Sequence, residues 1–197
     1  RPRGEATLRL EGGAIGEIEE LALEATLALD GRNTTASLRG SRGRTRFQAD
    51  GTAAWPIGER GPLTLDATLQ GLDLRELGRL FELPERIAGR VDAAVSLHGS
   101  LAAPRGTVEV KGRDLAARGI GGGGLELRAE LAEGIHLVVD GAVGGSQLAA
   151  DLQLGLAPEG LLADLDRALD VPLRGAIDAK GIDVGEILAA ASPAIER

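Results

Sequence analysis

Residues 81–110 carry the sequence FELPERIAGRVDAAVSLHGSLAAPRGTVEV, and this stretch decides the fold. From Gly89 onward, apolar and polar residues alternate. Because successive side chains of a strand point to opposite faces, this alternation predicts a half-buried strand. Gly99–Pro104 then predicts a turn that interrupts the ladder, and residues 107–111 predict a second strand with Val108 and Val110 on one face. The apolar parity of the first strand consists of Val91, Ala93, Val95 and Leu97.

The same alternation recurs on both sides of this stretch, so we expect an all-β chain of about ten antiparallel strands. Asp-Gly pairs at residues 30–31, 50–51 and 140–141 predict hairpin turns, since both central residues of a type I′ turn need positive φ. Gly12-Gly13 is expected to close the first strand. The expected strands cover residues 6–11, 18–30, 34–39, 46–50, 62–70, 89–98, 107–111, 125–131, 135–139, 147–156 and 172–180.

Two segments change from strand to helix spacing, and we expect two short helices there. In residues 72–81, apolar side chains recur at intervals of three and four, and Asp73 with Glu76 forms a capping box. Residues 182–191 repeat this pattern. The pattern of residues 161–169 is ambiguous, with a helix as one interpretation.

An internal repeat links residues 62–78 to residues 172–188. Pro62 aligns with Pro172 without a gap, an offset of 110 residues, and both copies keep Asp-x-x-Glu where the predicted helix starts. We therefore expect a modular sheet that grows sideways and is cut at both ends. The chain has no Met, even at position 1, so we expect residues 1–197 to be a fragment of a longer or processed protein.

The composition narrows the possible function classes. Hydrophobic residues make up 43% and charged residues 26%, which is typical of a folded chain rather than a disordered one. A net charge of −8 argues against nucleic-acid binding, because phosphate contacts need a positive surface. With 2% aromatic residues there is almost no stacking surface, and with no Cys there is neither a disulfide framework nor a thiolate site.

No constellation of catalytic residues or metal ligands emerges, and we expect neither enzyme activity nor a cofactor. His98 and His136 fall on the polar parity of their strands, and with no Cys their spacing argues against a metal site. Residues 119–124 contain the letters of Gly-x-Gly-x-x-Gly, but a strand pattern follows them, which favours a hairpin connection over a phosphate cradle. A basic cluster is interpreted as a solvated loop, with contact to lipid head groups or an anionic partner as the alternative; it consists of Arg39, Arg42, Arg44 and Arg46.

Leu-Pro at 83–84, Ile-x-Gly-x-Val at 87–91 and His-Gly-Ser-Leu-Ala-Ala-Pro-Arg-Gly at 98–106 resemble the TamB branch of the AsmA-like bacterial envelope proteins. The motif-level likeness covers residues 71–110, with a partial second copy near the end. The resemblance implies a long sheet curled into an open apolar half-pipe, or β-taco. It also implies a periplasmic segment of an inner-membrane-anchored Gram-negative envelope protein. Its implied roles are phospholipid transport and outer-membrane biogenesis as part of a translocation and assembly module, with a BamA-like barrel partner reached through the full-length chain.

Alternation alone is compatible with two arrangements of the apolar face. In a closed β-sandwich, two such faces bury each other, whereas an open groove leaves the face to phospholipid acyl chains. A structural or adhesin-like β-repeat is a further alternative, but it predicts a repeat of about 20 to 30 residues that the sequence lacks. The resemblance and the repeat favour the groove. Its expected lining residues are Val91, Val95, Leu97, Val108, Val110, Leu127, Leu137, Leu148 and Leu152.

Overall fold

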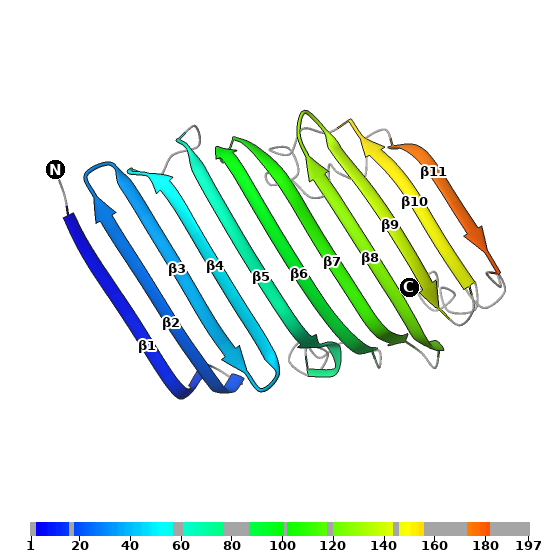
Figure 1. Cartoon of the computed structure of the whole chain (residues 1–197), viewed down its shortest axis with the longest axis horizontal. Helices are drawn as coiled ribbons and strands as arrows, with labels where there is room; N and C mark the ends of the chain where they lie inside the picture. The colour runs from blue at the N-terminus through cyan, green and yellow to red at the C-terminus, as the bar shows by residue number, and fades with distance from the viewer. Residues whose placement is uncertain are drawn as a thin grey trace, which may run out of the picture.

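The computed structural model describes residues 3–15, 18–56, 61–76, 87–100, 102–117, 120–143, 146–155 and 173–181. These residues form one antiparallel sheet of eleven strands, in which each strand pairs with its neighbours in the chain (Figure 1). The all-β class and the open antiparallel sheet predicted from the sequence are confirmed. The strands are β1 (Arg3–Ile15), β2 (Ile18–Asp30), β3 (Asn33–Arg42), β4 (Thr45–Ala54), β5 (Leu63–Asp73), β6 (Ile87–Ser100), β7 (Ala103–Ala117), β8 (Ile120–Leu131), β9 (Ile135–Val143), β10 (Ser146–Leu154) and β11 (Leu173–Lys180).

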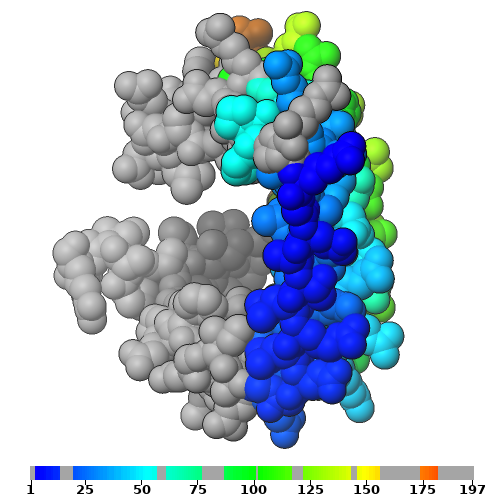
Figure 2. Space-filling view, turned by 90° about the vertical axis from the view of Figure 1, so that its left-hand side faces the viewer, coloured from blue at the N-terminus to red at the C-terminus, as the bar shows by residue number. Residues whose placement is uncertain are grey.

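The described strands form a single layer, which is visible when the sheet is viewed from its β1 edge (Figure 2). β1 and β11 lie at the two lateral edges of the sheet. Within the described ranges no large side chain is fully buried, and the buried apolar residues are Leu21 and Ala150. The apolar side chains therefore pack against neighbours on adjacent strands of the same sheet, because the described part of the chain has no second sheet to cover them.

Of the three turns predicted at Asp-Gly pairs, two are wrong, and at the third a hairpin forms with a different turn type. Residues 50–51 lie inside β4 and residues 140–141 inside β9, where they pair with the strands on both sides. Neither glycine has a positive φ, so these Asp-Gly pairs lack the backbone shape of a type I′ turn. A hairpin does form after Asp30, which pairs with Asn33, but the central residues of its turn are Gly31 and Arg32. Only Gly31 has a positive φ, of 67°, so this turn is not type I′ either.

The first strand also continues past its predicted end. Gly12-Gly13 lies within β1 and coincides with a register shift between Leu10 and Gly13. Gly12 has a φ of 60°, a conformation that glycine adopts without steric strain. The strand can therefore contain this register shift and remain paired in the sheet.

The turn after β6 is shorter than predicted. Gly99 pairs with Pro104, so Pro104 belongs to β7 and the ladder with β6 continues through it. On its other side, the pairing of β7 with β8 ends at Gly106 and Leu131, so no described strand there needs an N–H from Pro104. Residues 120–124 lie in β8 rather than in a hairpin connection, which corrects the prediction for the glycine-rich stretch.

The first predicted helix is described only as far as Glu76. Residues 74–76 are helical, and Asp73 Oδ1 accepts a hydrogen bond of 2.8 Å from the N–H of Arg75, as an N-cap does. The Glu76 carboxylate lies 3.4 Å from Nη1 of Arg42. The rest of this helix, and the predictions for residues 161–169 and 182–191, lie outside the described residues. No described helix is long and apolar enough to cross a membrane.

Candidate functional site: the apolar face of the sheet

One face of the sheet is here called the apolar face. It contains three adjacent cross-strand rows that run across all eleven strands without a polar or charged residue. Directly opposed residues of antiparallel strands share a face, so the register defines each row. The first row is Leu8, Ala25, Leu38, Ala49, Ala67, Val95, Val108, Ala129, Leu137, Leu152 and Gly175. The second row is Leu10, Leu23, Gly40, Phe47, Leu69, Ala93, Val110, Leu127, Val139, Ala150 and Ile177. The third row is Ala6, Leu27, Ala36, Gly51, Leu65, Leu97, Gly106, Leu131, Ile135, Leu154 and Leu173.

All residues that the sequence predicts as groove lining lie on the apolar face. The first row holds Val95, Val108, Leu137 and Leu152; the second holds Val110 and Leu127; and the third holds Leu97. Val91 and Leu148 belong to a fourth row that continues the face over β5 to β11. This row is Leu72, Val91, Gly112, Leu125, Gly141, Leu148 and Ala179.

The predicted lining stops at β6, but the apolar face continues to β1 and is hollowed there. The hollow has a volume of about 410 Å³ and lies over β1 to β5. Small residues of β2, β3 and β4 form its floor, while Leu8 and Leu27 stand at its side with 60% and 50% of their surface exposed. The lining residues on the apolar face are Ala6, Leu8, Ala25, Leu27, Ala36, Leu38, Ala49, Gly51 and Leu65.

The opposite face, here called the polar face, carries charged side chains in cross-strand pairs. Arg9 Nη2 lies 2.8 Å from Glu24 Oε1, and Arg128 Nη1 lies 2.9 Å from Glu109 Oε1. The hydrogen bond that Glu24 accepts from Arg9, together with the charge of Arg9, lowers the pKa of the Glu24 carboxyl. These pairs are exposed, so each contributes little to stability, but they mark this face as the hydrated one.

Both histidines lie on the polar face, as the sequence predicts. His98 pairs with Arg105 of β7, and His136 Nε2 lies 2.8 Å from Asp151 Oδ1. Across the described residues, no group of three or more His, Cys, Asp or Glu side chains could hold a metal ion.

The predicted basic loop is mostly strand. Arg39 and Arg42 belong to β3 and Arg46 to β4, which leaves only Arg44 in the turn between them. Arg39 and Arg46 border a hollow of about 580 Å³ that also includes charged Glu24. Charged and polar side chains thus contribute to the lining of this hollow beside apolar ones, whereas the hollow over β1 to β5 has no charged lining residue.

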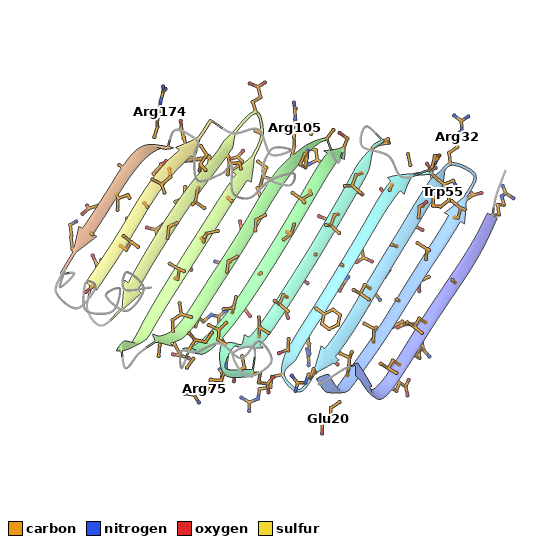
Figure 3. The ribbon with its side chains drawn as sticks, turned by 180° about the vertical axis from the view of Figure 1, so that it is seen from behind. Glu20, Arg32, Trp55, Arg75, Arg105 and Arg174 are labelled. Carbon is orange, nitrogen blue, oxygen red and sulfur yellow. The ribbon has the colours of Figure 1, made fainter. Side chains whose placement is uncertain are left out.

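Polar and amphipathic side chains project from the two rims of the sheet, where the strands end. Arg32, Arg105 and Arg174 project from one rim together with Trp55, and Glu20 and Arg75 lie at the opposite rim (Figure 3). Trp55 is 45% exposed, and its backbone N–H donates a hydrogen bond of 2.6 Å to the carbonyl of Arg32. The apolar face is therefore bordered by polar groups along both rims.

Comparison of the chain with known protein families, with curated proteins and with solved structures finds no match.

Proposed function

We propose that the apolar face binds the acyl chains of phospholipids and that the chain is a segment of a bridge-like lipid-transfer protein, not an enzyme. One observation carries this proposal: three neighbouring rows run across all eleven strands without a polar residue. An ordinary sheet would bury such a face against a second layer, and the described part of the chain supplies none.

The gain from covering an acyl chain is large. Transfer of a chain of about 16 carbons into water costs on the order of 12 kcal/mol, at about 0.8 kcal/mol per methylene. Eleven strands spaced about 4.8 Å apart give a track of roughly 50 Å along the sheet. A lipid moving along this track exchanges one aliphatic contact for another, so most of the barrier to leaving a membrane is removed without chemistry.

Curling of the sheet into a half-pipe with the apolar face inside is part of the proposal. Six register shifts support it, because a β-bulge bends its strand and increases the local twist. They lie toward the rim from which Glu20 and Arg75 project, at Leu10/Gly13, Gly13/Ile15, Leu69/Leu72, Ala88/Arg90, Gly112/Leu115 and Leu115/Ala117. The polar lipid head groups would then lie at the seam between the rims.

The proposed wider role is that of a TamB/AsmA-like protein. Phospholipids would pass between the inner and outer membranes through the periplasm, and this flow would support outer-membrane biogenesis together with a BamA-like barrel. The resemblance of residues 71–110 supports this role, and the continuous apolar face is compatible with it.

The test is native mass spectrometry of the purified chain with lipid extraction. We expect phospholipid to co-purify with the chain and to be lost in Leu97→Asp, which places a carboxylate between Leu65 and Gly106 on the apolar face. The matched control is His98→Asp, which places the same charge one residue away on the polar face and should retain lipid. Far-ultraviolet circular dichroism should show strand content in both variants. A chain without bound lipid, or equal retention by both variants, would contradict the proposal.

A further inference from the structure

The internal repeat places equivalent glycines at the ends of two strands that are six positions apart in the sheet. β5 and β11 begin at Leu63 and Leu173, at the repeat offset of 110 residues. Gly71 of the first copy and Gly181 of the second both have a φ of 67°. The two copies therefore share a left-handed backbone conformation at the same position, where glycine is favoured.

A side-chain hydroxyl from the preceding strand holds each of these glycines. Thr45 Oγ1 of β4 donates a hydrogen bond of 3.2 Å to the carbonyl of Gly71. Ser146 Oγ of β10 donates a hydrogen bond of 2.7 Å to the carbonyl of Gly181. The two repeat copies are thus attached to their preceding neighbour in the same way.

On the following side, the two copies differ. The N–H of Gly71 donates a hydrogen bond of 2.7 Å to Asp92 Oδ1 of β6, and Arg113 Nη2 of β7 lies 2.6 Å from the other oxygen of this carboxylate. Beside β11, the described ranges contain no strand on the side away from β10. Gly181 therefore has no counterpart of Asp92 within the described residues.

The apolar face is also incomplete at this edge. Ile177 is 63% exposed and occupies the repeat position of Ala67, which lies opposite Val95 of β6. β11 has neither a proline nor a charge on its apolar parity, the usual means by which an edge strand avoids pairing.

We propose that the edge of β11 away from β10, with which no described strand pairs, is a docking site for a strand of the β6 type. This partner runs antiparallel to β11, has aliphatic residues on one parity and carries a carboxylate that accepts a hydrogen bond from the N–H of Gly181. The repeat offset fixes its register: the residue equivalent to Val95 faces Ile177, and the residue equivalent to Leu97 faces Gly175. This docking site is independent of lipid binding, because it uses the backbone edge of the sheet.

The test uses the full chain and a synthetic peptide with the sequence of residues 87–100, IAGRVDAAVSLHGS. We expect the peptide to slow amide hydrogen exchange in residues 173–181 while exchange in β1 stays unchanged. A second peptide carrying Asp92→Ala should bind roughly tenfold more weakly, because it lacks the carboxylate that accepts the hydrogen bond from the glycine N–H.

Three results would overturn this proposal. They are unchanged exchange in residues 173–181, equal protection of β1 and β11, and equal binding of the two peptides. Sedimentation of the chain without peptide supplies a further check. A dimer already paired through β11 would show that the edge takes a second copy instead of a β6-type strand.

Discussion

Leu27→Asp tests the energetics of the apolar face at the hollow over β1 to β5. Complete burial of a leucine side chain stabilises by about 1.5 to 3 kcal/mol, and half of the Leu27 surface is exposed. A bound acyl chain would therefore gain about 1 kcal/mol from covering Leu27. An aspartate at this position would also have to lose its water, at a cost of several kcal/mol for an unpaired carboxylate. We expect the affinity for a long-chain acyl ligand to fall at least roughly 100-fold, since each 1.4 kcal/mol is a factor of about ten.

The assay is a titration of the chain with a fluorescent phospholipid below its aggregation concentration. Thr35→Asp is the matched control, because Thr35 pairs with Ala28 and Thr52 on the polar face and does not line the hollow. It should bind lipid like the unmodified chain. Leu27→Asp should unfold at a denaturant concentration only slightly lower than the control does, because the leucine it replaces is already half exposed. Equal affinities in the two variants would refute the assignment of binding to the apolar face.

Three further predictions concern stability and ionisation. Gly106→Ala should lower the free energy of unfolding by about 3 kcal/mol in chemical denaturation, because the φ of Gly106 is 142° and a Cβ there would overlap β6. The control Gly4→Ala should leave the free energy of unfolding unchanged, because the space around Gly4 is open. Thr34→Val should leave stability unchanged or raise it by about 1 kcal/mol, because the buried Thr34 Oγ1 has no hydrogen-bond partner among the described residues; a clear loss would contradict this. In Arg9→Gln, NMR titration should show the pKa of Glu24 rising toward its ordinary value. Because the pKa of Glu24 is lowered in the folded chain, the stabilisation from this carboxylate is present above its pKa in the unfolded chain. It is lost as the pH falls through the pKa in the folded chain.

The strands and their two faces could be predicted because a period of two directly separates the side chains that share a face. The Asp-Gly pairs at 50–51 and 140–141 show where local signals fail. Each pair lies inside a strand that is paired with a neighbouring strand on both sides. This cross-strand pairing outweighs the local preference for a turn. Pro104 joins the ladder for a similar reason, because its lack of an N–H matters only where a neighbouring strand needs one.

The apolar face could also be predicted, but its hollow could not. Ala25, Ala36 and Ala49 form the hollow only because the register brings small residues of three strands together beside longer leucines. Each alanine taken alone is an unremarkable member of an alternating strand. The hydrogen bonds from side-chain hydroxyls to the carbonyls of Gly71 and Gly181 could not be predicted either, because they join residues 26 and 35 positions apart in the chain.

Photo-crosslinking with a phospholipid that carries a diazirine in its acyl chain shows directly which residues of the sheet contact hydrocarbon. After irradiation and digestion, mass spectrometry identifies the residues that the acyl chain touched. We predict crosslinks on the apolar rows, including Leu27, Leu65 and Leu97, and few on polar-face residues such as Thr35 and His98. Crosslinks spread equally over both faces, or absent from the apolar rows, would contradict acyl-chain binding by this face.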